Sequence, residues 1–149
     1  PAPREVSRAR VRACCHNCEQ EVLAALRSCD SVKLCVAWLT HLNILMELYH
    51  IPCQVVITAD RIHRKVHKHL RSLKVRKVGK ASSRCRPLMH HKFAVGCIGG
   101  KPSFVLLGSY NYSTAGARNL ENVVRIDSPA IAKAYAEEAD ILYALGRPA

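Results

Sequence analysis

Short apolar runs rich in β-branched residues alternate along the chain with segments whose apolar residues recur at helical spacing. The runs predict strands over residues 32–39, 54–58, 75–78, 92–97, 104–107 and 122–126. The helical spacing predicts helices over 19–26, 41–49 and 60–73, and a last helix that begins at Ser128-Pro129 and ends at Gly146. Strands that alternate with helices in this way predict a layered α/β domain.

The segment 60–73 has a buried stripe and a basic face. Asp60 is predicted to cap its N-terminus, and the stripe comprises Ile62, Val66, Leu70 and Leu73. The outer face carries Arg61, Arg64, Lys65, Lys68 and Arg71. Three histidines lie in the same segment, namely His63, His67 and His69. We interpret them as part of the basic face rather than as metal ligands at i, i+4 spacing.

The chain length and the charge balance narrow the class of protein. The 149 residues suit a single domain over 1–149, in which residues 1–14 form a loose or edge segment. With 49% hydrophobic and 23% charged residues, the chain is neither a disordered tail nor a membrane bundle. The formal net charge is +12, and the 60 residues between Asp60 and Glu121 hold 14 of the 23 Lys and Arg residues and no carboxylate. Such a surface favours a polyanionic partner and disfavours a Mg²⁺ site built from several carboxylates.

Eight cysteines leave two interpretations open at one place. Most look like small buried hydrophobes, since Cys35, Cys53 and Cys97 lie in apolar runs, and a domain of this length does not need disulfides. We therefore expect an intracellular, reducing compartment. The cluster Cys14-Cys15-His16-Asn17-Cys18 is either half of a zinc site or a group of reduced thiols at the start of a helix.

The sequence contains no apolar stretch near the ~20 residues that span a bilayer. The chain begins with Pro rather than Met. Membrane tethering through an N-terminal segment that has been removed therefore remains compatible with the sequence.

Two patches carry candidate chemistry. In Met89-His90-His91-Lys92, the imidazole of His90 and the ammonium of Lys92 are two residues apart as a strand begins, so they project to the same side. Ser109 and Asn111 repeat this spacing in Gly108-Ser109-Tyr110-Asn111, at the end of the next strand. If the two strands are neighbours, a cation and two neutral donors meet around a nucleophilic imidazole. This combination suits phosphoryl transfer and needs no metal.

These patches, together with the segment Arg118-Asn119-Leu120-Glu121-Asn122-Val123-Val124, resemble the phospholipase D superfamily, whose signature is HxKxxxxD followed by GSxN. The pattern is similar to the small members with one motif per chain, the bacterial endonuclease Nuc and the Zucchini or mitochondrial cardiolipin hydrolase group. The resemblance covers roughly residues 15–145. It implies a mixed β-sheet sandwiched between helices.

The resemblance also implies roles for individual residues. His90 would be the nucleophile that forms a phosphohistidine, while Lys92 and Asn111 would bind phosphate oxygens. Ser109 would line the same pocket, and Glu121 would orient a histidine of the site. No metal or other cofactor is implied. One position departs from the signature, because Cys97 replaces its Asp.

A single HxK motif implies two chains. Displacement at phosphorus needs a nucleophile on one side and an acid at the leaving oxygen opposite, so we expect a homodimer whose two His90 side chains share one site. The function expected first is a metal-independent endonuclease that holds DNA or RNA against Arg61, Arg64, Lys65 and Lys68. The alternatives are a phospholipase of the cardiolipin hydrolase kind acting on anionic phospholipid, and a catalytically weakened nucleic-acid-binding homologue.

Overall fold

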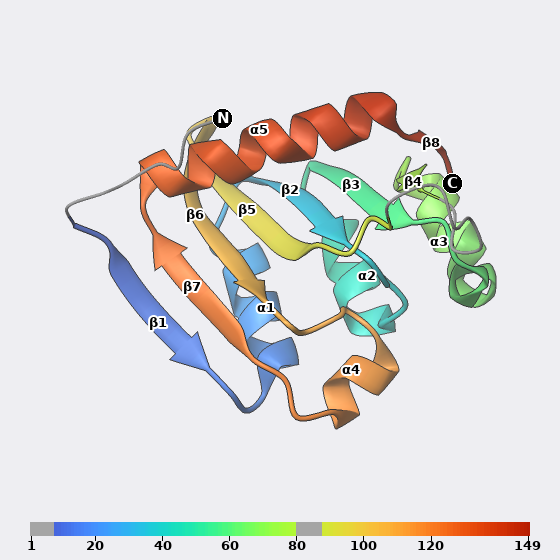
Figure 1. Ribbon diagram of the computed structural model, residues 1–149, viewed down its shortest axis with the longest axis horizontal. Coiled ribbons are helices and arrows are strands. Elements are labelled where there is room, and N and C mark those ends of the chain that lie inside the picture. The colour runs from blue at the N-terminus through green and yellow to red at the C-terminus, as the bar shows by residue number, and fades with distance from the viewer. Residues whose placement is uncertain (1–7, 80–87) are drawn as a thin grey trace.

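The computed structural model describes residues 8–79 and 88–149. Within these ranges, eight strands form one sheet in the order β1-β7-β6-β5-β2-β3-β4-β8 (Figure 1). The strands are β1 (Arg10–Cys14), β2 (Ser31–Val36), β3 (Cys53–Thr58), β4 (Arg76–Val78), β5 (Lys92–Ile98), β6 (Lys101–Gly108), β7 (Val123–Asp127) and β8 (Arg147–Pro148). The sheet is mixed, because β2, β3 and β4 run parallel and the other pairs are antiparallel.

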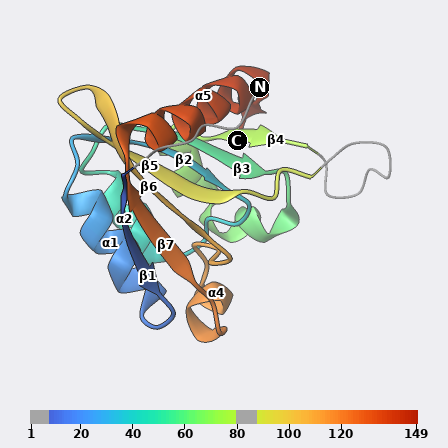
Figure 2. The same cartoon turned by 60° about the vertical axis from the view of Figure 1, so that its left-hand side comes forward.

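Helices cover both faces of the sheet, which confirms the predicted fold class. α5 (Pro129–Leu145) crosses one face, while α1 (Cys18–Arg27) and α2 (Leu42–Leu48) pack on the other (Figure 2). Ser128 caps α5 as predicted, since its hydroxyl accepts a hydrogen bond from the Ile131 N–H at 3.3 Å. Two short elements were not predicted, the helix α4 (Thr114–Arg118) and the strand β8.

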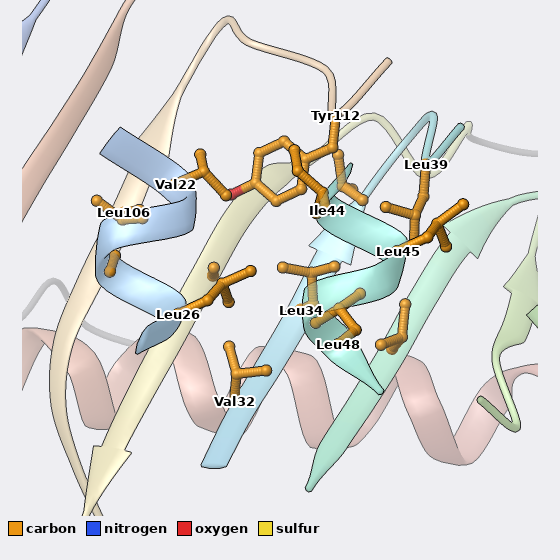
Figure 3. Packing of buried hydrophobic residues seen from close by; sticks show 14 of the residues in the cluster. Val22, Leu26, Val32, Leu34, Leu39, Ile44, Leu45, Leu48, Leu106 and Tyr112 are labelled. Carbon is orange, nitrogen blue, oxygen red and sulfur yellow. The ribbon is translucent and has the colours of Figure 1, made fainter. Parts of the chain in front are cut away.

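The core has one layer on each side of the sheet. Figure 3 shows the larger one, in which Val22 and Leu26 of α1 and Ile44 and Leu48 of α2 pack on Leu34 of β2. The second layer lies under α5, whose small residues Ala132, Ala136 and Ala139 let the helix approach the strands. Cys35 and Cys97 are buried in this layer as predicted, and Cys53 is half-buried.

The prediction of one helix over 60–73 is wrong. The segment forms a 3-10 helix, η1 (Arg61–Val66), followed by the α-helix α3 (His67–Ser72). Asp60 caps it as predicted, because its Oδ1 accepts the Ile62 N–H at 2.9 Å. In a 3-10 helix residues i and i+3 lie on the same side, so His63 and Val66 both turn inward and each is 4% exposed. His63 is therefore not part of the basic face.

Three further expectations concern the margins of the fold. The edge segment at the N-terminus is a strand from Arg10 onward, paired with β7, and its first seven residues lie outside the described part of the chain. The sequence also predicts a basic, polar loop over 79–87, and from residue 80 on this segment lies outside the described part of the chain. No described helix combines the length and apolar character that crossing a bilayer requires.

Candidate active site at one edge of the sheet

Four chain segments meet at one edge of the sheet because of the strand directions. β5 runs antiparallel to both β2 and β6, so the start of β5 lies beside the ends of those two strands. Val36 is paired with Lys92, and Gly108 is paired with Val123 at the start of β7. The residues that follow β2 and β6 and precede β5 and β7 therefore come together, although they are far apart in sequence.

His90 and Lys92 lie against each other at this edge. The Lys92 Nζ is 3.1 Å from the His90 Nδ1 and donates to the His90 carbonyl oxygen at 3.0 Å. His90 is exposed and Lys92 is half-buried. His91 faces the other way, toward α5, where its Nε2 lies 3.5 Å from a carboxylate oxygen of Glu138. The alternation expected for a strand is thus present at the residues expected to react.

Partial burial and a nearby carboxylate act on Lys92 in opposite directions. Burial lowers the pKa of Lys92, and the negative charge of Glu121 raises it. Glu121 therefore lies close enough to stabilise the charged form of the ammonium. A charged Lys92 is the form that attracts a phosphate.

Ser109 and Glu121 join the end of β6 to the start of β7. The Ser109 hydroxyl donates to the Glu121 carboxylate and accepts the Asn122 backbone N–H at 3.1 Å. The Asn119 side-chain amide also donates to Glu121, at 3.5 Å. The hydroxyl proton of Ser109 is thus directed at Glu121 in the single chain, rather than being free for a phosphate.

Asn111 is held by the segment that follows β2. Its Oδ1 accepts the Trp38 backbone N–H at 3.1 Å, and Leu39 pairs with Tyr112 in an isolated parallel bridge. Tyr110 and Tyr112 are buried on either side of Asn111, at 1% and 2% exposure, and fix its backbone. The segments after β2 and after β6 run side by side here (Figure 1).

The basic residues of the 60–73 segment lie beyond the end of β3, which is parallel to β2 and so ends toward the same edge. Arg61, Arg64, Lys65 and Lys68 are all exposed. Arg61 and Arg64 line a hollow of about 250 Å³ that also includes His67 and Lys77. This surface could contact an anionic polymer at a position outside the contact between His90 and Lys92.

The cluster at Cys14, Cys15 and Cys18 lies close to Glu121. The Cys18 thiol donates to the Glu121 backbone oxygen at 3.6 Å, and burial raises the pKa of Cys18 to about 11. All three cysteines are free thiols. Within residues 8–79 and 88–149, no group of three or more His, Cys, Asp or Glu side chains is arranged to hold a metal ion.

Cys97 lies far from His90 and Lys92. It is five residues beyond Lys92 on β5, or about 17 Å at the usual rise of a strand, and it is 4% exposed in the apolar layer under α5. The departure from the HxKxxxxD signature therefore affects the packing at the far end of β5 and not the surroundings of His90.

Two residues that shape the site were not predicted. The Trp38 backbone N–H holds Asn111, and the buried His63 ring accepts the Leu39 N–H at 3.1 Å. The first contact uses a backbone donor, which no residue type reveals. The second depends on the 3-10 turn, which the apolar spacing did not indicate.

Known structures share this fold over nearly the whole chain. Nuc from Salmonella typhimurium, a phospholipase D family member, is 19% identical with a TM-score of 0.77, covering 95% of this chain and 99% of Nuc. NucT from Helicobacter pylori is 18% identical with a TM-score of 0.76, covering 95% of this chain and 100% of NucT. TrmBL2, an archaeal chromatin protein with a novel mode of DNA binding, is 12% identical with a TM-score of 0.58, covering 97% of this chain and 54% of TrmBL2.

Sequence comparison gives the family. No curated protein sequence matches the chain. The family described as "Cardiolipin synthase, PLD-like domain" matches residues 12–143, which include every strand of the sheet except part of β1 and the two-residue β8. With this match and the shared fold, the chain belongs to the phospholipase D-like domain family.

Proposed function

We propose that the protein is a metal-independent phosphodiesterase that cleaves DNA or RNA through a phosphohistidine intermediate in a homodimeric active site. The observation that carries the proposal is the contact between His90 and Lys92, 3.1 Å apart at the sheet edge that also holds Asn111 and Glu121. An imidazole beside a cation, an amide and a carboxylate supplies a nucleophile and the donors that phosphoryl transfer needs.

The reaction would take two displacements. An unprotonated imidazole nitrogen of His90 attacks phosphorus, a nitrogen–phosphorus bond forms, and the bond to the leaving oxygen breaks. That oxygen takes a proton from His90 of the partner subunit. Water then attacks phosphorus and gives a proton back to the partner's His90, while the nitrogen–phosphorus bond breaks, which frees His90 and releases the phosphate product. Lys92 and the Asn111 amide would hold the nonbridging oxygens through both steps.

Charge favours nucleic acid as the substrate. Arg61 and Arg64 line the hollow beyond β3, and Lys68 lines a neighbouring one with Arg71. Spaced cations of this kind match the repeating phosphates of a polynucleotide, and they act on many phosphates at once rather than on a single headgroup.

One observation favours phospholipid as a second candidate substrate. A hollow of about 430 Å³ lies beside His90 and is lined largely by apolar side chains, those of Val78, Leu88, Met89 and Leu142. An acyl-glycerol group next to the scissile phosphate would bury apolar surface there. The same hollow would also accept the flat face of a nucleobase.

The substrate is tested by incubating the protein in EDTA with labelled single- and double-stranded DNA and RNA, and in parallel with cardiolipin vesicles. We expect cleavage of a nucleic acid by the wild type and none by His90→Ala. Lipid turnover without nucleic-acid cleavage would replace the first candidate by the second. Activity that EDTA removes would refute the metal-free mechanism.

The shared site is tested by mixing. Wild type and His90→Ala are unfolded together, refolded at several ratios and assayed. If one site needs both His90 side chains, activity falls as the square of the wild-type fraction. A linear fall, or a fully active monomer in light scattering, would refute the homodimeric mechanism.

A further inference from the structure

The segment after β2 contributes to the site through hydrogen bonds to residues that are distant in sequence. It lies between two elements that are remote in sequence. On one side, the Trp38 N–H donates to Asn111 and the Thr40 N–H donates to the Tyr112 carbonyl oxygen at 2.9 Å. On the other side, the Leu39 N–H donates to the His63 Nε2 of η1 at 3.1 Å. Leu39 itself is fully buried.

The hydrogen bond with Trp38 fixes the orientation of the Asn111 side-chain amide. A backbone N–H requires an acceptor, so the oxygen of the Asn111 amide faces Trp38. The NH₂ group is then left as the donor, which is the end of the amide that a phosphate oxygen needs. Any shift of Trp38 would move or release this donor.

His63 is suited to hold the segment because it is an acceptor inside an apolar layer. It is 4% exposed, and its Nε2 accepts a hydrogen bond, so the ring proton is on Nδ1. Burial lowers the pKa of His63, which keeps the ring neutral and Nε2 unprotonated. A protonated ring would present a second N–H to the Leu39 N–H and break the contact.

We propose that His63 is a positioning residue of the active site, which holds Leu39 and thereby sets Trp38 and the Asn111 amide for phosphate binding. The proposal rests on the proposed function, since it assigns Asn111 to the phosphate. His63 lies outside the HxK and GSxN motifs, and on this proposal it acts on Asn111 through Leu39 and Trp38.

Three variants separate positioning from general stability. His63→Leu fills the space without an acceptor and leaves the Leu39 N–H unpaired. His63→Gln keeps a side-chain oxygen that can accept it. Val66→Ala is the matched control, because Val66 is also 4% exposed and lies on the same side of η1, one turn after His63, but its side chain cannot form a hydrogen bond to the segment after β2. Each is assayed for kcat and KM, and for its denaturant midpoint.

We expect His63→Leu to lower kcat by up to about a hundredfold, the scale of an ångström-size displacement of a catalytic group. His63→Gln should recover most of that loss, and Val66→Ala should lower the midpoint while leaving kcat unchanged. Wild-type kcat in a folded His63→Leu protein would overturn the proposal. So would a loss in His63→Gln as large as in His63→Leu, or an equal loss in Val66→Ala.

A spectroscopic readout keeps the proposal testable if His63→Leu does not fold or if no substrate is cleaved. In ¹⁵N-labelled wild type, a scalar coupling across the hydrogen bond between the Leu39 nitrogen and the His63 Nε2 should be observed, and its absence would overturn the proposal. Where His63→Leu folds, the Asn111 side-chain amide signals should shift in that variant and stay near their wild-type positions in His63→Gln and in Val66→Ala. A wild type that cleaves no phosphodiester but shows both signatures would reject the proposed function and retain the positioning role.

Discussion

The Ser109 hydroxyl and the Glu121 carboxylate share a hydrogen bond between the end of β6 and the start of β7. The same hydroxyl oxygen accepts the Asn122 N–H, so one small side chain fixes the carboxylate and the backbone beside it. Burial lowers the pKa of Lys92, and the negative charge of Glu121 opposes this shift. Ser109 is thus connected through the carboxylate to Lys92, the cation proposed to bind phosphate.

Ser109→Ala should lower activity through Glu121. The free energy of unfolding should fall by about 1 kcal/mol, because the hydrogen bonds of the hydroxyl to Glu121 and to the Asn122 N–H are lost at an exposed position. The pH above which phosphate binding weakens should move downward, as it should in Glu121→Gln, because Lys92 loses the carboxylate that favours its charged form. The double variant is compared with both single ones by titration of phosphate affinity against pH. Strictly additive shifts would show that Ser109 does not act through Glu121.

Gly108→Ala should disrupt the site from the backbone. A Cβ on Gly108 would lie 2.2 Å from the Asn122 carbonyl oxygen, closer than real atoms approach. The pairing of Gly108 with Val123 must therefore open, at a cost of about 1–3 kcal/mol in the free energy of unfolding. Urea denaturation checks this, with the exposed Lys101→Ala at the other end of β6 as the control. Equal midpoints for the two variants would contradict the close approach.

Restoring the acid of the family signature should not raise activity. Cys97→Asp would place a carboxylate at a 4% exposed position in the apolar layer under α5. We expect it to lower the free energy of unfolding by about 2 kcal/mol or more, and to leave kcat within the range of Cys97→Ser. Thermal unfolding measures the change in stability, and the cleavage assay measures kcat. A large gain in kcat would mean that the far end of β5 controls the site.

The exposed cations of η1 and α3 should determine the salt dependence of binding. Each Lys or Arg that contacts a phosphate releases counterions, so its removal reduces the slope of log K against log salt by roughly one unit. Arg64→Ala and Lys68→Ala should each do so for single-stranded DNA or RNA, measured by fluorescence anisotropy. Lys133→Ala is the control, because Lys133 is an exposed cation on α5 and not on η1 or α3. An unchanged slope in both test variants would place the nucleic acid elsewhere.

Acid should destabilise the fold through His63. Burial lowers the pKa of His63 below its usual value of 6.5, so as the pH falls below 6.5 the unfolded chain takes up a proton that the folded protein excludes. The free energy of unfolding therefore decreases from neutral pH toward the folded-state pKa of this ring. Asp60 opposes this shift and Lys77 adds to it. Denaturant midpoints between pH 7 and 5 should fall less steeply in His63→Gln, and parallel curves would contradict the assignment.

The strands and the placement of the HxK and GSxN residues could be predicted because they depend on local pattern. Alternation brings His90 and Lys92 to one side and sends His91 to the other. An apolar run such as Val55–Ile57 favours a strand whatever its neighbours in the sheet are, and these three residues are fully buried. These features need no knowledge of the partner strand.

The features that were not predicted depend on contacts between remote segments, on short elements or on backbone atoms. The spacing of Val66 and Leu70 suits an α-helix, but His63 is drawn inward by the Leu39 N–H and the turn tightens into a 3-10 helix. The five-residue α4 is too short to show a period and includes Gly116. The role of Trp38 lies in its backbone, which every residue shares.

The two borders of the sheet bear on how copies of the chain can associate. The outer strand β1 presents Arg10 and Arg12, both exposed, and β8 ends on Pro148, whose nitrogen has no hydrogen to donate. Charge at one border and a missing donor at the other both discourage strands of neighbouring molecules from adding on. A continuous sheet running through two molecules is thereby disfavoured, which agrees with the proposed homodimer, in which two copies would meet at the strand ends that carry His90.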